Sequence, residues 1–218
     1  MGKILIGRME VGMLPTNFYF LHREGSADAI AVDPGAHGDG IFAELEKEKL
    51  TVRAILLTHA HFDHIWGLAA LREHTGAPVY AYEGEKHLCA DAQDNLSAMY
   101  GRACTVKPDI WLKDGEEAEA ADIAFRVLST PGHTEGSCCY YIDDSEAGGG
   151  HILLSGDTLF QGSVGRTDFP TGSMSALVRS LHDRLLPLPD DTVVCPGHGA
   201  ETVLGDEKAY NEYFAAGQ

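Results

Sequence analysis

Basic residues are scarce in this sequence. Its 218 residues include 16 Lys and Arg against 33 Asp and Glu, which gives a formal net charge of −17. Such a surface repels phosphate backbones, and no local stripe of basic residues is present to bind one. We therefore expect no nucleic-acid partner.

Cysteines are few, and long apolar runs are absent. The five cysteines are odd in number and form no Cys-x-x-Cys pair, so no disulfide framework or Cys-type zinc site is indicated. No run approaches membrane-spanning length, and no N-terminal segment has the pattern of a signal peptide. These absences predict a soluble, reduced, cytoplasmic protein without a membrane partner, and they leave its oligomeric state open.

What the sequence does contain suits one layered domain, residues 1–218. A hydrophobic content of 44% is enough for a full core. Apolar and β-branched runs predict strands at 3–10, 18–22, 29–32, 54–57, 79–81, 123–129, 138–142, 152–155 and 192–195. Helical spacing predicts helices at 40–49, 65–75, 173–185 and 206–214. Residues 84–116 indicate a short helical excursion, either along the rim of a site or serving packing alone. The order of elements predicts an α+β fold with two sheets inside and helices outside.

Residues 58–64 read Thr-His-Ala-His-Phe-Asp-His, directly after the apolar run 54–57. Three imidazoles this close together would repel one another once protonated. Their closeness, with a carboxylate beside them, is explained if they bind a metal cation in their neutral form. Imidazole and carboxylate ligands suit Zn²⁺, Fe²⁺ or Mn²⁺. The alternative is a plain surface histidine cluster, but such a cluster does not explain its place after a buried strand. The motif therefore predicts a metal site.

Three later loops share one format, an apolar strand that ends in a glycine-containing turn and exposes one ligand. They are 127–133, ending in Pro-Gly-His133; 152–157, ending in Ser-Gly-Asp157; and 193–198, ending in Pro-Gly-His198. Each alone is a weak indication, because Pro-Gly-His is about as often an ordinary turn. Together, behind the 58–64 motif, they predict the rest of the metal site.

With these motifs in place, the sequence resembles the metallo-β-lactamase-fold hydrolases, and most of all the short, single-domain bacterial relatives of glyoxalase II, or hydroxyacylglutathione hydrolase. The resemblance runs from Val-Asp-Pro-Gly at 32–35 through 58–64, Gly-Asp-Thr-Leu-Phe at 156–160 and Gly-Arg-Thr-Asp-Phe at 165–169 to Pro-Gly-His-Gly at 196–199. It implies an αββα sandwich of two mixed β-sheets flanked by helices. A binuclear site would lie along one edge, where loops at the strand ends converge.

The resemblance also implies a role for each site residue. The first metal would be held by His59, His61 and His133, the second by Asp63, His64 and His198, and Asp157 would bridge them. Asp33 would orient a ligating imidazole, although an Asp that caps its own turn is an equal alternative. Arg166 would contact a substrate carboxylate, with a structural pairing to Asp168 as the alternative.

Such a centre suits hydrolysis. Two divalent ions ~3.5–4 Å apart share a water and lower its pKa from 15.7 towards about 7. They also polarise the substrate carbonyl, while Asp63, assigned the catalytic role, accepts a hydrogen bond from the attacking hydroxide. We expect two divalent metal ions, zinc first with iron or manganese possible, and a small-molecule acyl thioester or ester as substrate. Metal affinity should fall below about pH 6, near the imidazole pKa.

Alternative functions fit the same motifs. A persulfide dioxygenase of this fold would use a single Fe²⁺ held by residues matching His59, His133 and Asp157, and metal analysis separates it from a hydrolase. A lactonase would use all seven ligands on an ester ring, so a lactone assay separates it. A metal-storing or sensor protein is a non-enzymatic alternative, which the open His and Asp ligand set disfavours.

Overall fold

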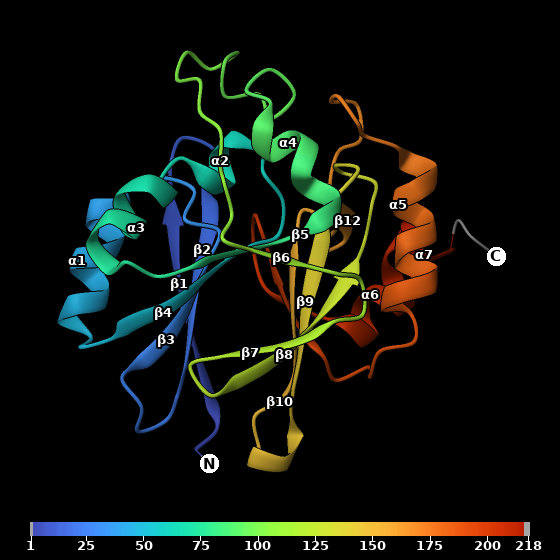
Figure 1. The fold of residues 1–218 in the computed structure, drawn as a ribbon. Coiled ribbons are helices and arrows are strands. Elements are labelled where there is room, and N and C mark those ends of the chain that lie inside the picture. The colour runs from blue at the N-terminus through green and yellow to red at the C-terminus, as the bar shows by residue number, and fades with distance from the viewer. Residues whose placement is uncertain (1, 216–218) are drawn as a thin grey trace.

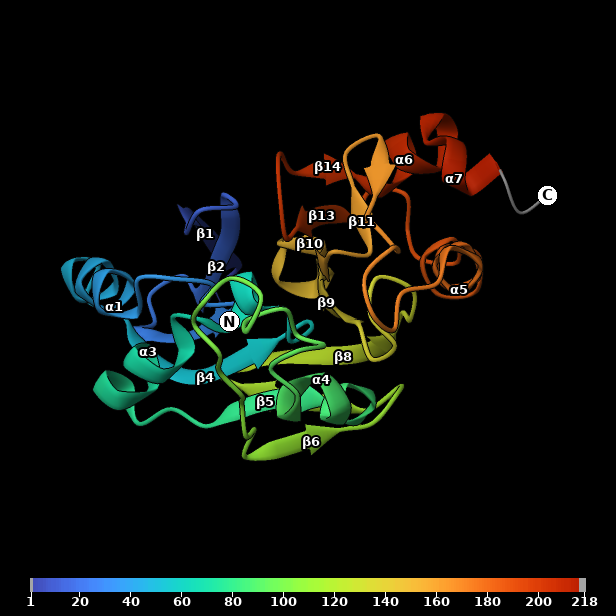
Figure 2. The same cartoon turned by 90° about the horizontal axis from the view of Figure 1, so that it is seen from above.

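Two six-stranded sheets face each other in the computed structural model, which describes residues 2–215. Helices cover the outer face of each sheet, so the layers run helix, sheet, sheet, helix (Figure 1). The view from above shows the four layers edge-on (Figure 2). The α+β prediction, with two mixed sheets flanked by helices, is confirmed.

The N-terminal sheet has the order β1-β2-β3-β4-β5-β6. Its strands are β1 (Ile4–Val11), β2 (Thr16–Arg23), β3 (Asp28–Val32), β4 (Thr51–Leu57), β5 (Val79–Tyr82) and β6 (Ile110–Leu112). The β1–β2 and β2–β3 pairs are antiparallel. The β3–β4, β4–β5 and β5–β6 pairs are parallel, so the carboxyl ends of β3 and β4 reach the same edge.

The C-terminal sheet has the order β14-β13-β10-β9-β8-β7. Its strands are β7 (Glu117–Ala120), β8 (Ile123–Ser129), β9 (Cys138–Asp144), β10 (Gly150–Gly156), β13 (Val193–Pro196) and β14 (Thr202–Val203). The β10–β13 pair is parallel and the other pairs are antiparallel. A small hairpin, β11 (Leu159–Phe160) with β12 (Ser163–Val164), follows β10.

The helices are short. Those over the N-terminal sheet are α1 (Gly38–Lys47) and α3 (Leu68–Thr75), and those over the C-terminal sheet are α5 (Met174–Ser180), α6 (Leu204–Tyr210) and α7 (Glu212–Ala215). A π-helical turn at Leu181–Leu185 continues α5, and 3₁₀ turns occupy Glu83–Glu85 and Ser145–Ala147. Two more helices, α2 (Phe62–Ile65) and α4 (Lys86–Ala90), lie at one edge of the sandwich. Within residues 2–215, no helix has the length and apolarity that a membrane crossing requires.

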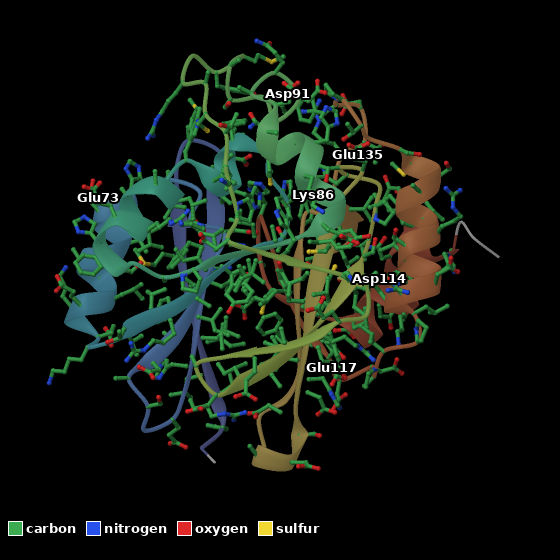
Figure 3. The ribbon with its side chains drawn as sticks, viewed as in Figure 1. Glu73, Lys86, Asp91, Asp114, Glu117 and Glu135 are labelled. Carbon is green, nitrogen blue, oxygen red and sulfur yellow. The ribbon has the colours of Figure 1, made fainter. Side chains whose placement is uncertain are left out.

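The core forms three apolar clusters, one between each pair of layers. Side chains fill the space between the two sheets, as Figure 3 shows. Strand alternation in β9 sends Cys138 into the cluster between the sheets and Cys139 into the cluster under the outer helices. Both cysteines are therefore buried, on opposite faces of the same sheet.

The predicted elements are present, with differences at short or broken segments. The helix predicted at 65–75 is interrupted at Trp66 and Gly67, because Gly67 N donates a hydrogen bond of 2.8 Å to Pro34 O outside the helix, so α2 and α3 are separate. The helix predicted at 206–214 is likewise interrupted at Asn211. Strands β6, β7, β11, β12 and β14 were not predicted. They have two to four residues each, too few for alternation to be recognised, and β7 reads Glu-Ala-Glu-Ala.

Candidate metal centre

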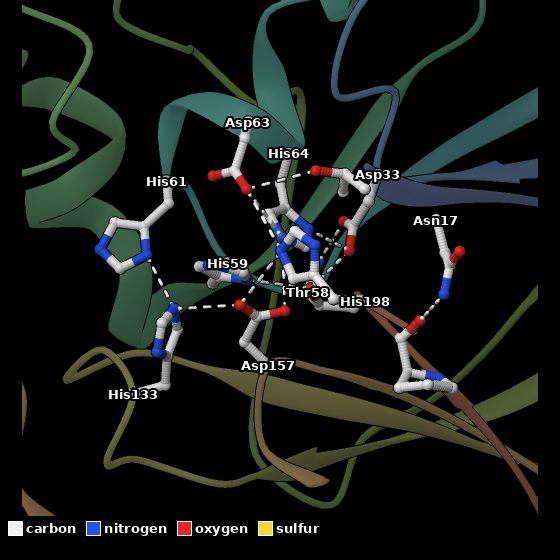
Figure 4. Close-up of polar contacts among 12 residues, drawn as sticks. Asn17, Asp33, Thr58, His59, His61, Asp63, His64, His133, Asp157 and His198 are labelled. Atoms are coloured by element: carbon white, nitrogen blue, oxygen red, sulfur yellow. Dashed lines mark hydrogen bonds and ion pairs between the residues drawn. The ribbon is translucent and has the colours of Figure 1, made fainter. Parts of the chain in front are cut away.

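All seven side chains that the sequence predicts as metal ligands meet at one edge of the sandwich (Figure 4). They come from segments that follow the carboxyl ends of β4, β8, β10 and β13. These side chains are His59, His61, Asp63, His64, His133, Asp157 and His198. The edge therefore brings together residues up to 139 positions apart, from 59 to 198. The parallel β10–β13 pair places Asp157 beside His198, and a bridge between Thr16 and His198 connects the two sheets there.

His59, His61 and His133 form the first group. One ring nitrogen of each lies within 4.8 Å of the others. The rings stand nearly perpendicular to one another, with interplanar angles of 85° to 89°. His61 Nδ1 is 2.8 Å from His133 Nε2. Three imidazole nitrogens converging on one point match the donor set of a zinc or iron site.

Asp63, His64 and His198 form the second group, again with one donor atom each within 4.8 Å of the others. Asp63 Oδ2 lies 3.2 Å from His198 Nε2 and 3.9 Å from His64 Nε2. His64 is fully buried, while the His198 side chain is 26% exposed, so this group is the more open of the two.

Asp157 lies between the two groups, as Figure 4 shows. Its Oδ2 is 3.5 Å from His133 Nε2 and 3.5 Å from His198 Nε2, and its Oδ1 is 3.4 Å from His64 Nε2. A Cβ at position 197 would overlap Asp157 Oδ1, so only glycine leaves the carboxylate in this place. One side chain thus contacts both groups, which is the position that a bridging ligand requires.

The chemistry of these donors fits a pair of cations. Among residues 2–215, four buried atoms of the cluster have no hydrogen-bond partner: His59 Nε2, His61 Nε2, His64 Nε2 and Asp157 Oδ1. Burying polar atoms without partners costs about 1–3 kcal/mol each, and more for charged groups. Because metal coordination would satisfy all of these atoms, the residues present fit the two ions that the sequence predicts.

Burial keeps the first group neutral. Loss of hydration, reinforced by the neighbouring imidazoles of His64 and His133, holds the pKa of His59 well below its ordinary value. Burial and His133 lower the pKa of His61 to about 3. Burial also lowers the pKa of His133, although Asp157 partly opposes the shift. These three rings therefore present free lone pairs at neutral pH.

The second group behaves differently because it contains more carboxylate. Burial lowers the pKa of His64, but the negative charges of Asp157, Asp33 and Asp63 more than offset this and place it well above its ordinary value. For His198, burial again lowers the pKa, and hydrogen bonding to Asp63 with the charge of Asp157 raises it overall. Protons therefore compete with a metal more strongly here than in the first group.

Asp33 supports this cluster from behind. Its Oδ2 accepts hydrogen bonds from Thr58 Oγ1 at 2.6 Å and from His64 Nδ1 at 2.9 Å, and its Oδ1 accepts one from Thr58 N at 2.8 Å. An ionised carboxylate only accepts hydrogen bonds, so His64 Nδ1 carries the proton of this contact. The lone pair of His64 Nε2 is then the one that would bind a metal in the site. Asp33 does this from a left-handed backbone conformation, with φ of 52°, which Asp tolerates better than most residues.

Arg166 lies at the mouth of the site and is paired. Its guanidinium donates two hydrogen bonds of 2.7 Å to the Asp168 carboxylate and stacks over the Phe169 ring at 3.9 Å. Its backbone oxygen also accepts a hydrogen bond of 2.7 Å from His133 Nδ1, which fixes that ring. The pairing with Asp168 named as the structural alternative is present, and substrate binding by Arg166 stays a prediction.

Two side chains that contact the metal motif were not predicted. Thr16, at the start of β2, donates from Oγ1 to Asp63 Oδ2 at 3.2 Å. Glu85 is buried beneath the site and accepts a hydrogen bond from Ala60 N. Neither has a sequence signal: Thr16 is an ordinary first residue of a strand, and Glu85 stands in a charged run, Glu-Gly-Glu-Lys, that is typical of a solvated surface.

Comparison with known proteins agrees with this geometry. The metallo-β-lactamase superfamily model matches residues 11–198. The probable metallo-hydrolase YqgX of Bacillus subtilis strain 168 is 41% identical over 209 residues, which cover 95% of this chain and 96% of that protein. Hydroxyacylglutathione hydrolase GloC of Haemophilus influenzae is 31% identical over 190 residues, covering 86% of this chain and 87% of that protein.

Solved structures give the same result. BLEG-1 B3 metallo-β-lactamase has a TM-score of 0.88 at 39% identity, covering 96% of this chain and 99% of its own. TTHA1623 in a di-iron-bound form has a TM-score of 0.79 at 36% identity, covering 95% and 99%. ETHE1 from Myxococcus xanthus has a TM-score of 0.76 at 30% identity, covering 95% and 83%. By family match, sequence identity and fold, this chain belongs to the metallo-β-lactamase superfamily.

Proposed function

We propose that this protein is a hydrolase that uses two divalent metal ions to cleave acyl thioesters or small acyl esters, with a glyoxalase II-like activity. The observation that carries the proposal is the position of Asp157, whose carboxylate contacts both ligand groups at 3.4 to 3.5 Å. The relative named hydroxyacylglutathione hydrolase supports the thioester as the substrate class. Zinc is the first choice for both ions, with iron and manganese as alternatives.

In the proposed reaction, the bound ions would activate a water as nucleophile and polarise the substrate carbonyl. The side chains of the protein would bind the ions and orient the attacking water. Asp63 would accept a hydrogen bond from the attacking water, which aims it at the carbonyl. Its Oδ2 already accepts from Thr16 and lies 3.2 Å from His198 Nε2, so the carboxylate has little freedom to turn away. This is the catalytic role we assign to Asp63.

The mouth of the site supports a small substrate with an apolar part. Phe169 lies against His61, with ring centroids 5.8 Å apart, and Phe160 lies against His198 at 6.1 Å. These rings would pack against an acyl chain or a thiol leaving group. Arg166 provides positive charge at the same mouth, partly neutralised by Asp168, and we propose that it attracts an anionic end of the substrate.

A persulfide dioxygenase is the second candidate, because ETHE1 from Myxococcus xanthus is similar to this chain. A single Fe²⁺ would need only His59, His133 and Asp157. Asp63, His64 and His198 form a second converging group that would hold a second ion in the two-metal hydrolase, so the number of bound metal ions separates the two candidates. A lactonase would use the same seven side chains, so substrate assays must separate it.

The experiment is a substrate panel on protein loaded in turn with zinc, iron and manganese. It contains S-lactoylglutathione, a thioester without the glutathione moiety, a homoserine lactone and glutathione persulfide with an oxygen electrode. We expect thioester hydrolysis to have the highest kcat/KM. Higher activity on the lactone would reassign the substrate class, and oxygen uptake that depends on glutathione persulfide in the iron-loaded protein would replace the hydrolase with a dioxygenase.

A further inference from the structure

Glu85 is a buried acid between half-buried residues at 82–84 and exposed residues at 86–87. It ends the 3₁₀ turn between β5 and α4, and it is 1% exposed, whereas the next residue, Lys86, is exposed. Figure 3 labels Lys86 on α4, and Glu135, whose carboxylate lies 2.8 Å from Nδ1 of the next α4 residue, His87. A buried carboxylate is unfavourable unless hydrogen bonds compensate for its lost hydration, so its partners indicate what it is for.

Those partners belong to two separate segments. Glu85 Oε1 accepts a hydrogen bond of 2.8 Å from Ala60 N. Thr134 Oγ1 lies 3.1 Å from Oε1 and 3.0 Å from Oε2, so the hydroxyl donates to the same carboxylate. Burial raises the pKa of Glu85 to about 7, and these hydrogen bonds oppose the rise.

The two segments are the ones that present the first ligand group. Ala60 stands between His59 and His61, and Thr134 directly follows His133. Ser137 extends the contact, since its Oγ lies 2.7 Å from Thr134 Oγ1 and accepts from Thr134 N at 3.1 Å. The backbones also meet closely, because a Cβ at position 136 would overlap Gly84 and Glu85 N. One carboxylate therefore joins the chain segments that carry all three imidazoles of the first group.

The second group is anchored by other residues. Asp33 holds His64, and Thr16 contacts Asp63. The amide of Phe62, which begins α2, donates to Asn95 O at 3.0 Å. Among the described residues, Glu85 makes no hydrogen bond to Asp63, His64 or His198. A change at Glu85 should therefore affect the two ligand groups unequally.

We propose that Glu85 is a positioning residue for the first metal: it sets the spacing between the His59–His61 segment and His133, and thereby sets the affinity of that ligand group over the other. The inference rests on the metal centre of the proposed function. Hydrogen-bonding groups behind metal ligands typically account for about 10–100-fold in metal affinity. The selectivity for one group is what distinguishes positioning from general support of the fold.

The test measures both metal affinities of the metal-free protein by titration with Co²⁺ against a competing chelator. His59→Ala and His198→Ala proteins identify which of the two dissociation constants belongs to which group. The variants are Glu85→Ala, Glu85→Gln, Thr134→Val and the double variant Glu85→Ala with Thr134→Val. The matched control is Glu207→Gln. Glu207 is 4% exposed and accepts hydrogen bonds from Gly162 N, Thr202 Oγ1 and Asn211 Nδ2, and it contacts none of the three imidazole segments.

We expect Glu85→Ala to raise the metal dissociation constant of the first ligand group by about 10–100-fold and to change that of the second group by less than about threefold. Glu85→Gln keeps one oxygen that accepts from Ala60 N but replaces the other carboxylate oxygen near Thr134 Oγ1 by an amide nitrogen, so it should raise the dissociation constant of the first group by less. It also provides the test if the alanine variant does not fold. Thr134→Val should also raise the dissociation constant of the first group. The double variant should lose less binding free energy than the two single variants together, because both changes break the same hydrogen bond between Thr134 and Glu85.

Equal loss at both groups, or a lowered Tm of the metal-free protein with unchanged affinities, would overturn the positioning role and leave the metal centre intact. Unchanged affinities in both Glu85 variants would do the same. If the unaltered protein takes up no metal, the proposed function itself fails, so the two failures are distinguishable.

Discussion

The Asp33 carboxylate holds the His64 ring, with Asp33 Oδ2 2.9 Å from His64 Nδ1. This contact leaves Nε2 of His64 pointing toward Asp157 and Asp63. We expect Asp33→Asn to weaken metal binding by the second group by about 10–100-fold, because the amide no longer accepts all three hydrogen bonds that the carboxylate receives. Metal titration of the variant checks this. Asp28→Asn, which alters only an exposed pair with Arg53, is the control, and equal affinities in the two variants would contradict the role.

Asp157→Ala should disturb both ions. Its carboxylate is the only side chain of the cluster placed against His133 of the first group and both His64 and His198 of the second. We expect metal content to fall at both groups and kcat/KM to drop by more than about a hundredfold, since even groups behind the ligands account for up to that much. Elemental analysis of the variant measures the loss. Retention of one ion at full affinity would remove the bridging assignment.

Arg166 and Asp168 make a paired prediction. Arg166→Ala should raise KM for anionic substrates by a few-fold, about 3–10, with a smaller change in kcat, because it removes attraction at the mouth of the site. Asp168→Ala should lower KM for the same substrates, since it releases the guanidinium from its carboxylate partner. Steady-state kinetics on a neutral and an anionic thioester provide the check. If both substrates respond alike, the Arg166 side chain is structural, through its pairing with Asp168 and its stacking on Phe169, and does not act through its charge on the substrate.

The two ligand groups should respond differently to pH. The lowered pKa values of His59, His61 and His133 leave these rings unprotonated at neutral pH, so acidification from about pH 8 to about pH 6 should hardly weaken their metal. His64 and His198, with raised pKa values, bind protons that a metal must displace, so affinity there should fall as pH falls. The slope is about tenfold per pH unit for each displaced proton.

Two variants isolate these slopes. His198→Ala leaves the first group intact, and His59→Ala leaves the second intact, so each reports one group in a metal titration at several pH values. A metal affinity that changes more steeply with pH in His198→Ala than in His59→Ala would contradict the prediction.

The sequence predicts the layered fold and the positions of the ligands, because both follow from local patterns. The run 123–129 predicts a strand with the bounds that the structure has, and three of the four ligand loops are glycine-containing turns after such a run, the fourth being the 58–64 motif. The meeting of residue 59 with residue 198 is not a local property. It follows from the resemblance to a family, and in the structure the bridge between Thr16 and His198 joins the two sheets at the edge where β4 and β13 end.

The supporting residues could not be predicted in the same way. Glu85 differs from its exposed neighbour Lys86 only in how β5 and α4 place it, and no periodicity marks that difference. Thr16 reaches Asp63 because β2 begins beside the site. The pairing of Arg166 with Asp168, which the sequence leaves as one of two alternatives, is present, and contact of this arginine with a substrate depends on a molecule outside the chain.

The measurement that tests the central claim most directly is the number of metal ions per chain, determined by elemental analysis of protein purified without chelator and then saturated with zinc, iron or manganese. We predict two ions per chain in the unaltered protein and one in each of His59→Ala and His198→Ala. A saturated value of one, or of none, in the unaltered protein would contradict the binuclear centre.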